Sequence, residues 1–282
     1  MSAPRVAPGL GHSPAVPDYH IHTSMCGHAS GTIEELVESA ISGGFSEIGI
    51  ADHLPLTYID DRTLSMSAGD LPSYVEQVME ARERYRGRIE VRLGIEADYH
   101  AETIDRIEAM LAAHPFDYVI GSVHAIGGWA FDDPRTADRL RELDLDSFYL
   151  EYLKTEVAMV RTGLYDIVGH ADLVKKFDNR ASVDLTSAYG ELLEAILDTG
   201  MCYEVNTAGL RWPAREMYPE PSFVRLGAKM GVPVTLGSDA HGPSDVGRDF
   251  DLALELVRSA GYTRVEDHPS RAATLVALAP DR

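Results

Sequence analysis

The sequence predicts an α/β fold in which parallel strands alternate with helices. Short β-rich runs alternate with longer amphipathic stretches along the whole chain, a pattern typical of a parallel sheet. No linker rich in Ser, Gly or Pro divides the chain into two halves. The length of 282 residues suits one large barrel, because α/β barrels often reach this size as a single unit.

Seven runs have the composition expected of buried strands. They are Pro17–Ile21, Ser46–Ala51, Ile89–Ile95, Tyr118–Val123, Asp166–Gly169, Cys202–Val205 and Val232–Leu236. In a parallel barrel the carboxyl ends of all strands meet on one face, where the active sites of such barrels lie. Side chains that follow the seven strands are therefore expected to converge.

Helical stretches lie between most of the strands. Thr32 and Glu35 have the spacing of a capping box, which begins a helix with a clear apolar face. Apolar residues at helical spacing predict further helices at Leu150–Val160 and at 185–199, the latter ending before a glycine. We expect at least one more helix, and a last strand, within 247–278.

Composition and charge exclude several classes of protein. A chain that is 45% hydrophobic and 25% charged is an ordinary globular mixture. No apolar run approaches the roughly 20 residues that a membrane span needs. A net charge of −20 repels a polyphosphate backbone, so we expect neither nucleic acid nor membrane as a partner. A small phosphorylated ligand is compatible with this charge if cations gather in one site.

The two cysteines and the first residues indicate the compartment. Two cysteines are too few for a disulfide framework and fit a reducing environment. Residues 1–17 contain Pro and Gly but no signal-peptide pattern. We therefore expect a cytoplasmic protein with a flexible arm at 1–17 and a single barrel domain at 18–282. The sequence leaves the oligomeric state open.

Side chains with metal-binding chemistry follow the predicted strands. In chain order they are His20, His22, Asp52, His53, Glu96, His124, His170, Asn206, Asp239 and His241. His20 and His22 have strand spacing, as do Asp239 and His241, so each pair can point to one side and hold one ion. Imidazole mixed with carboxylate suits zinc, iron or manganese. The sequence thus predicts a transition-metal site at the carboxyl ends of the strands.

The motifs around these residues resemble those of the PHP superfamily, named for polymerase and histidinol phosphatase. They are Asp18–Thr23 (DYHIHT), Ala51–His53 (ADH), Gly94–Glu96 (GIE), Gly121–His124 (GSVH) and Gly237–His241 (GSDAH). They occur in the expected order over roughly 18–250, most of the chain. The resemblance implies a distorted seven-stranded β/α barrel, similar to a TIM barrel, with three divalent transition-metal ions.

The resemblance also implies how nine ligands are shared among three ions. The first ion would be bound by His20, His22, Glu96 and Asp239. Glu96 would bridge to a second ion, which His124 and His170 also hold. His28, His53 and His241 would hold the third ion. None of the nine family ligands is missing from the sequence.

Further stretches resemble the monofunctional histidinol-phosphate phosphatases of histidine biosynthesis. They are Gly121–Asp132, Gly169–Phe177 and Glu204–Arg211, the last followed by Tyr218 and Pro219. This implies a hydrolase that converts L-histidinol phosphate, a small phosphate monoester, to L-histidinol and phosphate. Two alternatives stay open: a related phosphoesterase acting on nucleotides, such as a 3′,5′-bisphosphate nucleotidase or an exonuclease, and a non-catalytic metal-binding module.

The chemistry of the ions leads to an expected mechanism. Metal ions lower the pKa of bound water, so two ions bridged by Glu96 could hold a hydroxide for in-line attack on phosphorus. The third ion and Arg211 would bind the phosphate oxygens. The predicted catalytic residues are Glu96, Asp239, His241 and Arg211. The sequence does not identify the proton donor to the leaving group.

Other residues are predicted to contact the substrate or to orient ligands. Trp129 and Asp132 are candidates for a wall against the imidazole and ammonium groups of the substrate. Lys175 lies shortly after His170 in the sequence and could reach the phosphate. Asp18 and Asp52 are expected to orient neighbouring histidines, as carboxylates behind metal ligands commonly do.

Overall fold

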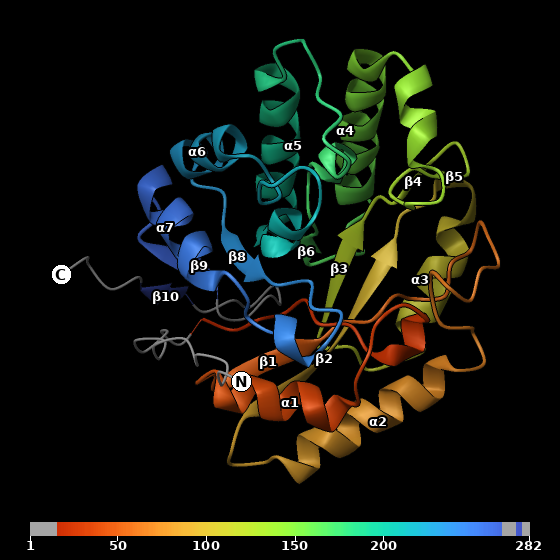
Figure 1. Cartoon of the computed structure of the whole chain (residues 1–282), viewed down its shortest axis with the longest axis vertical. Helices are drawn as coiled ribbons and strands as arrows, with labels where there is room; N and C mark the ends of the chain where they lie inside the picture. Colours follow the sequence, from red (N-terminus) through yellow and green to blue (C-terminus); the bar gives the residue numbers. More distant parts are fainter. Residues whose placement is uncertain (1–15, 267–274, 278–282) are drawn as a thin grey trace, which may run out of the picture.

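Six parallel strands form a curled sheet around which helices are arranged in this computed structural model (Figure 1). The structure describes residues 16–266 and 275–277, so most of the predicted arm at 1–17 lies outside the described residues. The sheet has the order β1-β2-β3-β6-β7-β8. These strands are Glu47–Ile50, Glu90–Asp98, Tyr118–Ser122, Ile167–Val168, Cys202–Asn206 and Val234–Gly237.

Seven α-helices are assigned within the described residues. They are α1 (Ile33–Ser42), α2 (Leu71–Arg84), α3 (Ile104–Ala112), α4 (Leu145–Arg161), α5 (Thr186–Thr199), α6 (Pro221–Met230) and α7 (Phe250–Ala260). Short 3-10 helices are η1 (Ser24–Cys26), η2 (Ala101–Thr103), η3 (Ala137–Glu142), η4 (Leu173–Lys175), η5 (Thr207–Arg211) and η6 (Pro243–Asp245). No helix of the described part is long and apolar enough to cross a membrane.

Two small antiparallel pairs lie outside the main sheet. Strands β4 (Ala125–Ile126) and β5 (Trp129–Ala130) form a hairpin in the connection after β3. Strands β9 (Arg264–Glu266) and β10 (Leu275–Ala277) pair near the end of the chain. The helix expected within 247–278 is present as α7, and this part of the chain holds two strands, β9 and β10, where one was expected.

The first predicted strand, 17–21, differs from the prediction. It forms isolated parallel bridges, Asp18 with Ile48 and Ile21 with Ala240, and is not assigned as a strand. The main sheet therefore has six strands in the described residues, where seven were expected. The segment is hydrogen-bonded to the β1 side at Asp18 and Ile21, but the backbone N–H of His20 between them donates to the Asp18 side chain. The physical reason is therefore an interruption within the segment, so no continuous ladder forms. The segment nevertheless joins β1 to the residues that follow β8.

Local sequence features explain where the helices begin and end. The capping box of α1 is present, since Thr32 and Glu35 each bond the other's backbone N–H through their side chains. Helix α4 begins five residues earlier than predicted because Asp144 caps it. Helix α5 ends at Gly200, whose φ of 72° is a left-handed conformation that favours glycine.

The buried side of the sheet holds the ligand-bearing N-terminal segment in place. Tyr118 is buried inside the sheet and its hydroxyl donates a 2.6 Å hydrogen bond to the carbonyl of Tyr19. Glycines at 49 and 94 leave room for this ring, since a Cβ on Gly49 would lie 1.9 Å from the Tyr118 hydroxyl oxygen. The Tyr118 hydroxyl thus fixes the chain next to His20, the first predicted metal ligand.

Candidate metal centre

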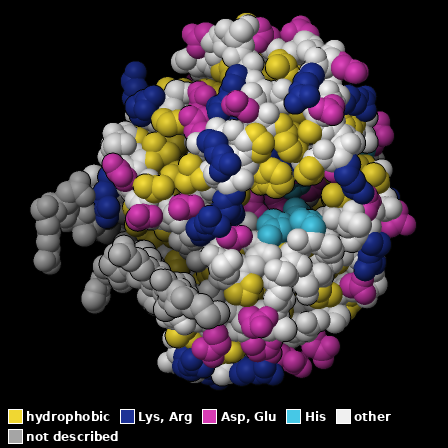
Figure 2. All heavy atoms as spheres, viewed as in Figure 1, with side chains coloured by type: hydrophobic (Ala, Val, Ile, Leu, Met, Phe, Trp, Pro, Cys, Tyr) yellow, Lys and Arg dark blue, Asp and Glu magenta, His cyan; other side chains and the backbone are white. Residues whose placement is uncertain are grey.

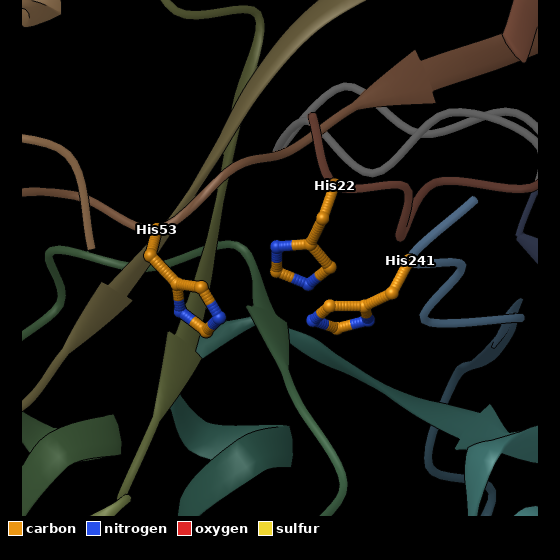
Figure 3. Close-up of side chains that lie close together, drawn as sticks. All are labelled: His22, His53 and His241. Atoms are coloured by element: carbon orange, nitrogen blue, oxygen red, sulfur yellow. The ribbon is translucent and has the colours of Figure 1, made fainter. Parts of the chain in front are cut away.

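The predicted ligands lie together where the carboxyl ends of the strands meet. Figure 3 shows His22, His53 and His241, which come from three separate segments, with their rings close together. The ring of His22 lies 4.4 Å from that of His53 and 4.2 Å from that of His241, between centroids. The ring of His28 lies 4.7 Å from that of His241. Residues more than 200 positions apart therefore form one cluster.

Glu96 lies at the centre of the cluster and is buried. Its Oε1 is 3.0 Å from His170 Nε2 and 3.5 Å from His124 Nε2. Its other oxygen, Oε2, is 3.0 Å from His53 Nδ1, 3.4 Å from His20 Nε2 and 3.5 Å from His22 Nε2. The two oxygens of one carboxylate thus face two different groups of histidines, as a bridging ligand would.

Asp239 completes the group around the first histidines. Its Oδ1 lies 3.2 Å from His22 Nε2 and 3.9 Å from His20 Nε2. Its φ of 51° is a left-handed conformation that is uncommon outside glycine and is often found at functional sites. The ligand atoms of His20, His22 and Asp239 lie within 4.8 Å of one another, and so do those of His22, His53 and His241.

Several buried atoms in the cluster show that these residues fit metal ions. His20 Nε2, both ring nitrogens of His22, His170 Nδ1 and Glu96 Oε2 make no hydrogen bond within the described residues. A buried polar atom without a partner costs about 1–3 kcal/mol. Divalent cations would satisfy most of these atoms, and imidazole with carboxylate is a donor set that zinc, iron and manganese accept.

The charges within the cluster shift the pKa values of its members. Burial lowers the pKa of His124, but Asp98 and Glu96 outweigh this effect and raise it to about 10. Burial, together with neighbouring His53 and His22, lowers the pKa of His28 to about 4. The cluster therefore has a side dominated by carboxylates and a side dominated by imidazoles.

Carboxylates behind the histidines hold the rings in place. Asp98 accepts a 2.6 Å hydrogen bond from His124 Nδ1, and Tyr58 donates to the same carboxylate at 2.7 Å. Glu204 lies 2.9 Å from His20 Nδ1. The sequence analysis did not identify Asp98 or Glu204. The spacing in the sequence could have indicated both residues. Asp98 lies two residues after Glu96, and Glu204 lies two residues before Asn206, so each shares one side of a buried strand with a predicted site residue.

The two aspartates predicted to orient histidines act on other atoms than expected. Asp18 accepts from the backbone N–H of His20 at 3.3 Å, while the ring of His20 faces Glu204. Asp52 accepts from the backbone N–H of His53 at 2.8 Å and lies 3.5 Å from His22 Nδ1. Both aspartates therefore position the ligand segments mainly through the backbone.

Arg211 lies beside the cluster at the end of η5. One of its terminal nitrogens, Nη2, donates to the carbonyl of Ser238 at 2.6 Å and to that of Asp239 at 3.1 Å. The other, Nη1, is buried and has no hydrogen-bond partner among the residues described. The guanidinium group is thus anchored on one side and has an unused donor on the other.

The structure gives Lys175 a different environment from the one expected. Its ammonium group is buried and lies 2.8 Å from Asp172 and 2.9 Å from Glu216, and it donates to the Met217 carbonyl at 2.8 Å. Three acceptors use the three donors of a lysine ammonium group. The Lys175 ammonium group therefore has no free donor for the predicted phosphate contact. Asp172 lies three residues before Lys175, whereas Glu216 lies 41 residues away.

Asp132 and Trp129, the two residues predicted to form a wall against the substrate, lie in different surroundings. Asp132 is paired with Lys176 at 3.0 Å, and its charge interacts with His124 and His170. Trp129 is on β5, with its ring 5.7 Å from that of Phe148 and with the Arg139 guanidinium 4.5 Å above it. Asp132 thus borders the cluster, whereas the contacts of Trp129 are with η3 and α4.

The cluster is accessible from one face of the molecule. Figure 2 shows histidine side chains in a hollow of the surface with acidic side chains beside them. His28 is exposed and His241 is partly exposed, while His20 and His22 are fully buried. A small ligand can therefore approach the imidazole-rich side from solvent.

A further buried acid, Glu156 on α4, leads to a pH-dependent prediction. Burial raises the pKa of Glu156 to about 8 from an ordinary value of 4.5. The folded state therefore binds the carboxyl proton of Glu156 more tightly than the unfolded state does. The stability gained from this protonation is complete below about pH 4.5 and is lost as the pH rises through 8. We expect Glu156→Gln, which is neutral at every pH, to gain stability relative to the wild type between pH 5 and 8.5, on the order of a few kcal/mol.

Thermal unfolding of both proteins at pH 5 and pH 8.5 measures this difference. Both proteins contain the same histidines, so the contribution of these residues cancels in the comparison. A difference in Tm that is the same at both pH values would show that Glu156 is not held protonated by burial.

Comparison with known proteins agrees with the motifs and the site. The PHP domain family model matches residues 18–208. A probable histidinol-phosphatase of Deinococcus radiodurans is 39% identical over 245 residues, which cover 86% of this chain and 93% of the relative. The histidinol-phosphatase of Bacillus subtilis is 30% identical over 84% of this chain and 98% of its own length.

Solved structures show the same fold. A putative histidinol phosphatase of Listeria monocytogenes has a TM-score of 0.77 and 26% identity, covering 84% of this chain and 99% of that one. The histidinol phosphate phosphatase of Lactococcus lactis was solved with zinc, L-histidinol and phosphate. It has a TM-score of 0.80 and 22% identity, and the match covers 92% of this chain and 99% of that one. The motifs, the site and these relatives lead to one conclusion: the chain belongs to the PHP domain family, and within it is similar to the histidinol-phosphatases.

Proposed function

We propose that this protein hydrolyses L-histidinol phosphate to L-histidinol and phosphate with the help of bound divalent metal ions. The observation that carries the proposal is the buried cluster around Glu96, in a chain that is 39% identical to a probable histidinol-phosphatase over 86% of its length. The Lactococcus lactis protein of the same fold was solved with zinc, histidinol and phosphate. The substrate is thus a small phosphate monoester, in agreement with the sequence prediction.

We assign the ligands to three ions. His20 and His22 face Glu96 Oε2 and, with Asp239 beside their rings, would hold one ion together with Glu96. His124 and His170 face Oε1 and would hold a second. The third set is His28, His53 and His241, whose rings pack on one another or on His22. Mixed nitrogen and oxygen ligands favour zinc, iron or manganese.

The protein's own groups then bind and orient the substrate. When bound, the ions supply positive charge for the phosphate and lower the pKa of water at the site. Arg211 would donate its free Nη1 to a phosphate oxygen, because its Nη2 is already fixed by the carbonyls of Ser238 and Asp239. Asp132 would bind the ammonium group of the substrate in place of Lys176. Anchoring of this kind aligns the phosphorus for in-line attack.

We also infer that residues 18–282 form one barrel domain in which 18–22 takes the place of a seventh strand. The backbone N–H of Gly49 donates to the Asp18 carbonyl at 2.8 Å, and that of His22 donates to the Ala240 carbonyl at 2.8 Å. These hydrogen bonds on both sides support closure of the sheet through this segment. They also explain why two ligands come from it.

A panel of phosphate esters, with released phosphate as the readout, tests the proposed function. Histidinol phosphate is expected to have a higher kcat/KM than aryl phosphates and 3′,5′-bisphosphate nucleotides. A bisphosphate nucleotide that is the better substrate by about tenfold, roughly 1.4 kcal/mol in transition-state binding, would favour the nucleotidase alternative. Absence of phosphate release from every ester by the metal-loaded protein would favour the non-catalytic alternative.

Replacing Arg211 with alanine is expected to weaken catalysis on every phosphate monoester. Charge-assisted hydrogen bonds contribute about 1.5–3 kcal/mol, so kcat/KM should fall roughly ten- to a hundredfold. Steady-state kinetics on histidinol phosphate and on an aryl phosphate measure the loss. An unchanged kcat/KM would show that Arg211 does not bind phosphate.

Asp132→Asn is the matched control for this experiment. An aryl phosphate carries no ammonium group, so this variant should lose activity on histidinol phosphate alone. Equal loss on both substrates, with metal content intact, would remove Asp132 from substrate recognition.

A further inference from the structure

We infer that Glu204 is a positioning residue that fixes the ligands of two ion sites together. Glu204 lies on β7 and is buried, with 1% of its side chain exposed. It contacts the ring of His20 and the backbone of His170, which belong to the first and second proposed ligand sets. The inference rests on the proposed metal-dependent function and deepens it, because it names what sets the geometry of the ions.

The contact with His20 determines which ring nitrogen is free. His20 Nδ1 lies 2.9 Å from Glu204 Oε1 and 3.0 Å from Oε2. A carboxylate only accepts hydrogen bonds, so Nδ1 carries the proton and donates. Nε2 is left to face Glu96, 3.4 Å away, without a hydrogen bond in the described structure. Glu204 thus selects the tautomer in which Nε2 can bind a cation.

The contact with His170 fixes the backbone of a ligand on the other side of Glu96. The N–H of His170 donates to Glu204 Oε1 at 3.1 Å. The φ of His170 is 20°, at the edge of the region that side-chain-bearing residues rarely adopt, and such a conformation needs support from its surroundings. This backbone directs His170 Nε2 to within 3.0 Å of Glu96 Oε1. The buried carboxylate of Glu204 therefore connects a ligand on the Oε2 side of Glu96, His20, with a ligand on its Oε1 side, His170.

Two neighbours fix Glu204 itself. Asn206, two residues further along β7 and so on the same side of the strand, donates from Nδ2 to Glu204 Oε1 at 2.7 Å. Gly237 on the adjacent strand β8 leaves the space that the carboxylate occupies, since a Cβ there would lie 2.3 Å from Glu204 Oε2. With donors on three sides, the carboxylate has a single orientation.

Metal binding by Glu204→Gln tests this role without any substrate. Glutamine keeps the shape but has one acceptor oxygen, so its NH₂ group must face one of the three donors that now point at Glu204. Loss of such a supporting carboxylate typically weakens metal binding about 10- to 100-fold. Competition of Zn²⁺ with a chromophoric chelator gives the affinity, and the visible absorption of the Co²⁺-loaded protein reports the ligand geometry.

Glu156→Gln is the matched control, because it also replaces a buried glutamate but one with no contact to the ring of a proposed ligand in the described residues. We expect weaker Zn²⁺ binding and an altered Co²⁺ spectrum in Glu204→Gln only. Wild-type affinity and spectrum in Glu204→Gln, or equal loss in both variants, would overturn the inference.

If circular dichroism shows that Glu204→Gln does not fold, Asn206→Ala replaces it in the test. Its Zn²⁺ affinity and its Co²⁺ spectrum are measured in the same way. That variant leaves the carboxylate but removes the Nδ2 group that donates to Glu204 at 2.7 Å and, at a longer 3.4 Å, to Asp239, so a smaller loss of affinity in the same direction is expected. No change in Asn206→Ala would then count against the inference. Because neither measurement uses a phosphate ester, a wrong substrate in the proposed function would leave these results unaffected.

Discussion

Removal of the bound metal with a chelator is expected to abolish phosphate release, with activity falling at least about a hundredfold. The reason is that several buried nitrogen and oxygen atoms of the cluster, Glu96 Oε2 among them, have no hydrogen bond in the described structure, and the phosphate would meet a cluster without its cations. Elemental analysis of the gently purified protein is expected to give about three ions per chain, from the three sets of ligands. Zinc or manganese added back should restore activity.

The melting temperature provides an independent check of the same prediction. A ligand that binds only the folded state stabilises it, so the chelated protein should unfold at a lower temperature than the loaded one. Full activity in a sample shown by elemental analysis to hold no metal would contradict the metal-dependent mechanism.

Glu96→Gln is expected to lower kcat/KM about a thousandfold, or roughly 4 kcal/mol in transition-state stabilisation. One oxygen of this carboxylate faces His170 and the other faces His20, so the change affects two proposed ion sites at once. An amide also directs an NH₂ group at ring nitrogens that should bind a cation. Steady-state kinetics together with metal analysis measure the effect.

His28→Ala and His53→Ala are the comparison variants for Glu96→Gln. His28→Ala removes a proposed ligand from the third set alone, and His53→Ala removes one that also lies 3.0 Å from Glu96 Oε2. Neither changes the two-sided carboxylate itself, so each is expected to lose less activity than the glutamate variant. Equal losses in all three variants would argue against a bridging role for Glu96.

The sequence could predict the site because parallel strands deliver their ends to one place. His20, Glu96 and Asp239 are far apart in the chain, but each follows or ends an apolar run, and this is enough to bring them together. Strand composition did not reveal that the ladder at 17–21 would be interrupted and reduced to isolated bridges, because pairing depends on neighbours that the local sequence does not contain.

Contacts between loops could not be predicted in the same way. Lys175 is paired with Glu216, which lies 41 residues away in a different connection, and no periodicity relates the two. The carboxylates behind the rings are an intermediate case. Glu204 and Asn206 share one side of β7, and this spacing can be read from the sequence. An acidic residue within a strand is usually exposed, however, and its burial could not be predicted without knowledge of its partner.

The segment at 18–22, which joins the two edges of the sheet, has a consequence for how the protein is made. It supplies His20 and His22 from the beginning of the chain, while Asp239 and His241 come from near its end. During synthesis the early proposed ligands leave the ribosome long before the late ones, so a chain that ends before residue 239 lacks two of the nine proposed ligands. If the proposed ligands bind metal, the complete centre can form only after residue 241 has been made, and a fragment that ends before residue 239 is expected to be inactive.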